Sequence, residues 1–150
     1  IQFVDGFKTI GDLVRFVGKQ NYLIAADSGP AHISKLFQTP GFGIYSSASA
    51  ETLQGRHKNL KTWQSNFKGP YCAAPCGLAK VRATADGKIG CMGSLNVPIE
   101  ELNQLPGNSD LALASSLVTH QPVPCVAQLV SDDAIIVASI LDDLGVVSTR

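Results

Sequence analysis

The sequence predicts an α/β fold, with a parallel sheet flanked by helices. Short apolar runs at Ile1–Val4, Tyr22–Ala26 and Gly41–Tyr45 are typical of strands, and segments with helical apolar spacing separate them. Turn and capping residues stand at the boundaries of these segments. Such an alternation indicates parallel strands joined by right-handed crossovers. The 150 residues are enough to bury one core.

A first helix is expected between the first two strands. Thr9, with Asp12 three residues later, resembles a capping box that has Asp in place of the usual Glu or Gln. Gly18 is expected to end this helix. The apolar residues that are predicted to share one face are Ile10, Leu13, Val14 and Val17.

In the central stretch, 21–37, an apolar strand runs directly into a second helix. Proline suits the first turn of a helix, so the sequence predicts a start at Ser28 or Gly29. A helix that begins at the carboxyl end of a parallel strand presents unpaired N–H groups there, and such a position favours phosphate. The helix is expected to bury Ile33, Leu36 and Phe37, and the ligand site is expected to comprise Asp27, Ser28, Gly29, Pro30 and His32.

A purely structural interpretation of this stretch stays open. Ser28 could simply cap the helix, and His32 could be a solvated surface histidine. Asp, Ser and His together also suggest a serine hydrolase, but a triad places the histidine between the other two, usually on separate loops. The G-x-S-x-G motif of such enzymes is not present in the sequence.

The segment 46–69 has no periodic pattern. Trp63 and Phe67 are expected to anchor it to the body of the protein. It is interpreted as a solvated loop, although a basic loop can also contact phosphates. Its basic or potentially basic side chains are Arg56, His57, Lys58 and Lys61.

A cysteine-containing loop spans 70–92. Cys72, Cys76 and Cys91 are expected to converge in space and are candidates for a structural metal site, with Cys125 or His57 as the fourth ligand. The C-x3-C spacing departs from the usual C-x2-C. Buried thiols or one local disulfide are therefore the alternative interpretation.

The region 107–150 is predicted to be a helical extension of unknown role. Before it, Pro98 opens a short helix that Pro106 closes, and within it a helix is expected at 110–118 and a strand at 123–130. Ser131 is expected to cap a last helix, 132–144, which must be buried in this domain or against a partner. That helix is apolar on nearly all sides: Ile135, Ile136, Val137, Ile140, Leu141 and Leu144.

Composition excludes several classes of function. Lys plus Arg and Asp plus Glu are balanced at 12 each, so no global charge favours nucleic acid. No apolar run approaches the roughly 20 residues that span a bilayer, and no signal peptide is visible. We therefore expect a cytoplasmic protein, with peripheral association with the inner membrane as an alternative.

Residues 1 to about 105 resemble the donor-binding half of the family 9 glycosyltransferases, the heptosyltransferase family of lipopolysaccharide biosynthesis. The resemblance depends on the sequence Asp-Ser-Gly-Pro-Ala-His at 27–32, between an apolar strand and a helix that Thr-Pro ends. Residues 7–13, Phe-Lys-Thr-Ile-Gly-Asp-Leu, look like the family's Gly-Lys-Thr-x-x-Glu-Leu segment, with Phe7 where glycine is usual.

The resemblance implies a GT-B glycosyltransferase with two Rossmann-like domains, of which 1–106 would be part of the donor-binding domain. Asp27 would then hold hydroxyls of the donor sugar. The amides around Ser28 and Gly29, at the turn that includes Pro30, would hold the diphosphate. His32 would contact the diphosphate or the nearby sugar. The implied reaction is inverting transfer from a nucleotide-diphosphate sugar such as ADP-heptose to a glycan, lipid-linked or protein acceptor, with no obligatory cofactor.

The family's catalytic base lies in its N-terminal domain, so the catalytic residues are unknown in this chain and the chain alone is expected to be inactive. The N-terminal domain is accordingly an expected partner. Two other hypotheses stay open. The chain could be a non-catalytic α/β nucleotide-binding or assembly module, or an interaction domain that a metal at the cysteines holds together.

Overall fold

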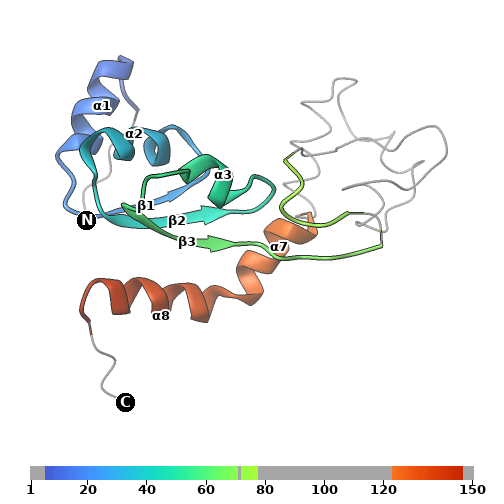
Figure 1. Ribbon diagram of the computed structural model, residues 1–150. Coiled ribbons are helices and arrows are strands. Elements are labelled where there is room, and N and C mark those ends of the chain that lie inside the picture. The colour runs from blue at the N-terminus through green and yellow to red at the C-terminus, as the bar shows by residue number, and fades with distance from the viewer. Residues whose placement is uncertain (1–5, 71, 78–122, 147–150) are drawn as a thin grey trace, which may run out of the picture. The chain divides into compact units, whose positions relative to one another are not determined.

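The computed structural model describes residues 6–70, 72–77 and 123–146, and within them three strands form one small open parallel sheet (Figure 1). The strands are β1 (Leu23–Ala26), β2 (Gly41–Tyr45) and β3 (Leu60–Gln64), in the order β1-β2-β3. Leu23 lies opposite Gly41, and Ala26 lies opposite Ile44. The α/β class and the strands expected at 22–26 and 41–45 are confirmed. The strand expected at 1–4 lies outside the described residues.

The chain divides into two compact units, which we describe separately. The first comprises Ile1–Tyr45, Ala50–Trp63 and Ile136–Arg150, and the second comprises Ser46–Ser49 and Gln64–Ile135. In the first unit, α1 (Ile10–Gly18), α2 (Gly29–Phe37) and α3 (Ala50–Gln54) lie on one face of the sheet. The helix α8 (Asp133–Asp143) lies on the other (Figure 1).

The capping box predicted for α1 is confirmed. The Asp12 N–H donates to Thr9 Oγ1 at 3.1 Å, and the Thr9 N–H donates to Asp12 Oδ2 at 3.0 Å. The predicted apolar face is only partly correct, because Val17 is buried whereas Ile10 is 79% exposed. The reason is that α1 packs on α2 through its last turns, where the Phe37 ring lies over Gly18.

The buried face of α2 differs from the predicted one. Ala31 and Ser34 are fully buried, whereas Leu36 is 73% exposed and Phe37 is half exposed. Small side chains allow the helix to approach the sheet closely, where Ala31 packs with Ala25 and Leu60. The Ser34 hydroxyl donates to the Ala31 carbonyl at 2.8 Å, which satisfies this buried polar group.

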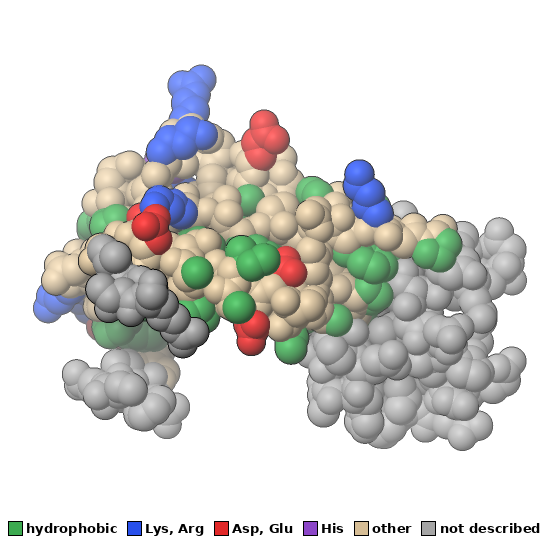
Figure 2. Space-filling model, turned by 90° about the horizontal axis from the view of Figure 1, so that it is seen from below, with side chains coloured by type: hydrophobic (Ala, Val, Ile, Leu, Met, Phe, Trp, Pro, Cys, Tyr) green, Lys and Arg blue, Asp and Glu red, His purple; other side chains and the backbone are tan. Residues whose placement is uncertain are grey.

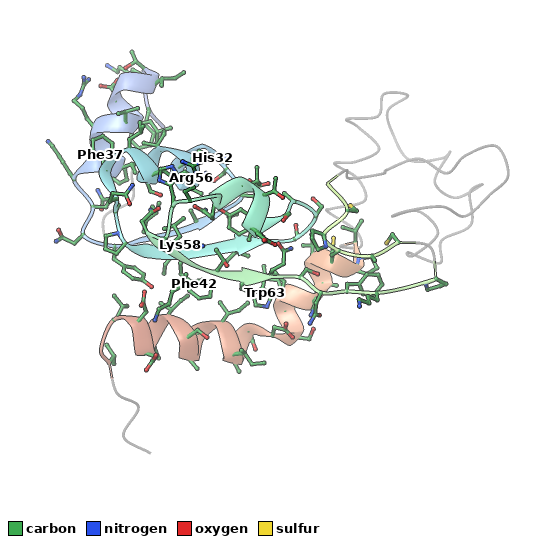
Figure 3. All side chains as sticks on the ribbon, in the orientation of Figure 1. His32, Phe37, Phe42, Arg56, Lys58 and Trp63 are labelled. Carbon is green, nitrogen blue, oxygen red and sulfur yellow. The ribbon has the colours of Figure 1, made fainter. Side chains whose placement is uncertain are left out.

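Helix α8 covers the sheet through a single face. Ile136 is 5% exposed, and Phe42 and Trp63 lie between the sheet and this helix (Figure 3). Ile135 and Val137 are 65% and 53% exposed, and apolar side chains remain visible on the surface seen from this side (Figure 2). Within this chain, the prediction that the helix is buried over most of its circumference is therefore wrong.

The C-terminal end of α8 is fixed by the carboxylate of Asp143. Its Oδ2 accepts from the Tyr22 hydroxyl at 2.7 Å, and its Oδ1 pairs with Lys61 Nζ at 2.6 Å. These two hydrogen bonds, first that from Lys61, lower the pKa of Asp143. Burial and the neighbouring carboxylate raise the pKa of Tyr22 to about 12. Because Tyr22 immediately precedes β1 and Lys61 lies early in β3, this contact joins α8 to the amino-terminal edge of the sheet.

In the second unit, the segment predicted as a strand at 123–130 is instead the helix α7 (Pro124–Ser131). The β-branched residues favoured a strand, but proline at the first helical position favours a helix start. Gln128 holds α7 to the chain after β3, because it bonds Ser65 Oγ at 2.8 Å and Asn66 Oδ1 at 2.7 Å. Ser131 belongs to α7 and does not cap α8 as predicted: its hydroxyl donates to the Gln128 carbonyl.

Candidate functional site

The candidate site lies at the carboxyl edge of β1 and β2, where the chain enters α2. Asp27 directly follows β1, and its N–H donates to the Ile44 carbonyl at 3.1 Å, which continues the ladder by one residue. Ser28 is extended and takes the N-cap position, and Pro30 lies in the first turn of α2. The helix start predicted at Ser28 or Gly29 is confirmed.

The N-terminus of α2 has no side-chain cap. The Ser28 hydroxyl donates backwards to the Ala26 carbonyl at 3.1 Å, and its oxygen accepts no hydrogen bond from the helix amides. His32 donates the first hydrogen bond of the helix, to the Ser28 carbonyl at 3.3 Å. The N–H groups of Gly29 and Ala31 precede this bond and, in the described part of the chain, have no intrahelical acceptor.

This open terminus contrasts with that of α1. The side chains of Thr9 and Asp12 satisfy amides at the start of α1, and Asp12 also pairs with Arg15 at 2.5 Å. The first turn of α2 is also open beside Gly29, because a Cβ placed there would have no atom from outside the turn within 4 Å. The simple interpretation of Ser28 as a helix cap is therefore wrong for this structure, and the α2 amides can meet a ligand.

Asp27 and His32 lie side by side at the open terminus. His32 Nε2 is 3.5 Å from Asp27 Oδ1, and the two side chains are 44% and 34% exposed. The other ring nitrogen, Nδ1, is 3.4 Å from Lys35 Nζ. Lys35 also donates to the Leu53 carbonyl in α3, so a polar chain runs from α3 to the site.

Behind Asp27 lies the buried phenol of Tyr45, the last residue of β2. Gln54 of α3 donates to its hydroxyl. Burial raises the pKa of Tyr45, and the nearby Asp27 carboxylate raises it further against the opposing effect of the Gln54 hydrogen bond. Tyr45 therefore remains a neutral phenol at physiological pH, next to an acidic residue that faces solvent.

The structure thus brings together the five residues that the sequence singled out: Asp27, Ser28, Gly29, Pro30 and His32. The sequence analysis did not identify the supporting residues Lys35, Tyr45 and Gln54. Lys35 could have been found, because it stands three residues after His32 and so on the same helical face. Gln54 had no comparable signal, since its contact with Tyr45 depends on how α3 packs.

The basic loop, residues 55–59, lies at the amino-terminal edge of the sheet, whereas the candidate site lies at the carboxyl edge. It enters β3 at its amino end, where the Asn59 carbonyl accepts from the Gly41 N–H at 3.0 Å. Arg56, His57 and Lys58 are exposed, and His57 Nδ1 is 3.2 Å from Gln38 Nε2. The interpretation of 46–69 as a solvated loop is therefore correct only for the short basic loop at 55–59. The rest of the segment contains α3 and β3, which the sequence analysis did not predict and which bury Ala50, Leu60 and Trp63.

The cysteines of the second unit lie on a short turn and on α7. Backbone hydrogen bonds between Gly69 and Cys72 and between Ala74 and Phe67 close the turn. Cys72 and Cys125 are half-buried and Cys76 is exposed, and no disulfide joins these three. Across 6–70, 72–77 and 123–146, no three Cys, His, Asp or Glu side chains are placed to hold a metal ion. Cys91 lies outside the described residues, so its convergence with Cys72 and Cys76 stays a prediction.

No single helix in the described part of the chain has both the length and the apolar character to cross a membrane. The pair α7 and α8, bent by 63° between them, meets these criteria only when the two helices are taken together. Comparison of this chain with protein-family models, curated proteins and solved structures gave no match.

Proposed function

We propose that this chain supplies the donor-binding part of an inverting glycosyltransferase that uses a nucleotide-diphosphate sugar. The observation that carries the proposal is the uncapped N-terminus of α2 beside Asp27 and His32, at the carboxyl edge of a parallel sheet. Ligands of open α/β sheets bind at this edge, and helix amides favour phosphate. The resemblance of residues 27–32 to the family 9 glycosyltransferases supports the same ligand class and suggests ADP-heptose.

The helix amides and the Asp27 carboxylate carry opposite charges, and we assign them different parts of the ligand. The amides of Gly29 and Ala31, which have no side-chain cap, would hold diphosphate oxygens. The Asp27 carboxylate repels phosphate, so it is suited to accept hydrogen bonds from the sugar hydroxyls. As the glycosidic bond breaks, negative charge develops on the leaving diphosphate, and helix amides together with the His32 N–H stabilise that charge.

Binding of nucleotides to the purified chain tests the proposal. ADP, AMP and ADP-glucose are compared by thermal shift and calorimetry, because AMP lacks the second phosphate and ADP lacks the sugar. A ligand at about 100 times its dissociation constant adds roughly 2.7 kcal/mol of stability. We expect ADP to bind more tightly than AMP, and a failure of every nucleotide diphosphate to bind would refute the proposal.

Two variants separate the roles within the site. Asp27→Asn is expected to weaken ADP-glucose more than ADP, because it removes a charged acceptor for the sugar. His32→Gln is expected to weaken both, by roughly ten- to a hundredfold for one charge-assisted hydrogen bond. Glu51→Gln is the matched control, since Glu51 is exposed on α3. Affinities within twofold of wild type for both site variants would contradict the assignment.

The alternative of a non-catalytic nucleotide-binding module predicts the same binding but no transfer. Reconstitution with the rest of the transferase, followed by an assay for transfer of the sugar to an acceptor, distinguishes the two. In that assay, Asp27→Asn should reduce turnover if the chain belongs to an enzyme.

A further inference from the structure

We propose that Lys35 is a positioning residue, which keeps Nδ1 of His32 unprotonated and directs the Nε2–H of the same ring toward the candidate site. The proposal deepens the function proposed above and rests on it for the identity of the ligand. The hydrogen-bond arrangement itself can be tested without any ligand.

The arrangement consists of three contacts around one imidazole ring. Lys35 lies one turn after His32 on α2, and its Nζ is 3.4 Å from His32 Nδ1. On the other side of the ring, Nε2 is 3.5 Å from Asp27 Oδ1. The ring is therefore placed between a cation and an anion, each facing a different nitrogen.

The chemistry of these groups determines where the ring proton sits. An ammonium group has three donors and no acceptor, so Lys35 can bond Nδ1 only when that nitrogen carries a lone pair. The neutral ring then has its proton on Nε2, the nitrogen that faces the Asp27 carboxylate. A neutral His32 is thus already a donor toward the site, and the positive charge behind it belongs to Lys35.

The packing of α3 fixes Lys35 in this position. The Lys35 ammonium also donates to the carbonyl of Leu53, in the last turn of α3. Carbonyls in the last turn of a helix have no intrahelical partner, and a lysine can satisfy them. Because this contact holds a partly buried side chain, the ammonium is oriented before any ligand arrives.

This arrangement changes the role expected of His32. A ligand oxygen, from a phosphate or a sugar hydroxyl, could replace or join Asp27 as the acceptor of Nε2–H without any proton uptake by the ring. Lys35 would favour an anionic oxygen at that position through its charge, although it does not contact the ligand itself. Removal of Lys35 should therefore change the tautomer of His32 even when no ligand is bound.

Nitrogen-15 NMR of the histidine rings in the full chain measures the tautomer directly. The chain has three histidines, and the His32 resonances are assigned by their absence in His32→Gln. We expect wild-type His32 to show a protonated Nε2 and an unprotonated Nδ1. Lys35→Met should shift the tautomer ratio toward protonated Nδ1 by roughly two- to tenfold, the value of one net hydrogen bond. Lys35→Arg, which keeps a cationic donor, should restore the wild-type ratio.

Lys58→Met is the matched control, because Lys58 is an exposed lysine at the other edge of the sheet. A wild-type His32 with its proton on Nδ1, or a Lys35→Met ratio equal to wild type, would overturn the proposal. If Lys35→Met does not fold, the wild-type spectrum and that of Lys35→Gln test the proposal instead. Lys35→Gln also removes the ammonium, so it should shift the tautomer ratio of His32 toward protonated Nδ1. A confirmed tautomer without any binding of ADP would reject the proposed function and leave this inference standing.

Discussion

The two neighbouring isoleucines of α8 provide the sharpest test of this structure. Ile136 is 5% exposed against the sheet, and Ile135 is 65% exposed on another side of the same helix. Both are replaced by alanine, one at a time. The chemistry of the two substitutions is identical, so their difference reports burial alone.

The expected magnitude follows from the atoms removed. Ile→Ala deletes three carbons, at about 0.8 kcal/mol each for transfer from water, and the cavity left behind brings the loss at a buried site to about 2–5 kcal/mol. The gain in helix propensity, up to about 0.7 kcal/mol, is the same in both variants and cancels in their difference. We therefore expect Ile136→Ala to be less stable than Ile135→Ala by roughly 2–4 kcal/mol.

Unfolding is followed by urea titration and by heating, with fluorescence of Trp63 as the probe. Trp63 is the only tryptophan of the chain, and it lies between the sheet and α8 (Figure 3). A loss of about 2–4 kcal/mol should lower the Tm by roughly 4–16 °C for a chain of this size. Ile135→Ala should change it little.

Equal destabilisation by both variants would refute the single buried face of α8. It would instead support the prediction from the sequence alone, in which the helix is buried on nearly all sides. A larger effect at Ile135 than at Ile136 would show that the helix is rotated relative to the structure described above.

The remaining predictions concern two glycines and the contact of Asp143 with Lys61 and Tyr22. Gly41→Ala places a Cβ 2.0 Å from a backbone carbonyl oxygen of β1, so we expect urea titration to show a free energy of unfolding lower by about 1–3 kcal/mol or more. Gly29→Ala has open space around its new Cβ, so it should leave the Tm unchanged but weaken ADP binding. Equal stability of the two variants would contradict this. The pKa of Asp143 is lowered from 3.8 by its hydrogen bonds from Lys61 and Tyr22, so its contribution to stability is present above pH 4 and lost as the pH falls through the folded value. The pKa of Tyr22 is raised to about 12, so its contribution is present below pH 10 and lost as the pH approaches 12. Asp143→Asn should flatten both dependences in Tm measured against pH, and an unchanged profile would show that this contact is not made in solution.

The local signals in the sequence predicted local structure well. Thr9 and Asp12 are three residues apart, and their capping box needs no contact beyond one helical turn. In the same way, the apolar run before Asp27 and the proline after it were sufficient to locate the junction of β1 and α2. The candidate site could be predicted because it lies within this single junction.

Predictions that depended on which side of a helix is covered were less successful. Leu36 and Phe37 are more apolar than Ala31 and Ser34, yet the small residues are the buried ones because they allow close contact with the sheet. Apolar periodicity measures the side chains of one helix and contains no information about the size of the space that its neighbour leaves.

The sequence by itself determined the α/β class, the positions of β1 and β2, and the placement of Asp27 and His32 at one helix start. Only the tertiary structure decided the position of the Lys35 ammonium beside His32, because Lys35 is bound by a carbonyl of α3, eighteen residues further along the chain. It also decided how α8 is held, since Asp143 meets Tyr22 across 121 residues of sequence. Hydrogen bonds and packing between distant segments depend on the geometry of the whole sheet, and no window of sequence contains that geometry.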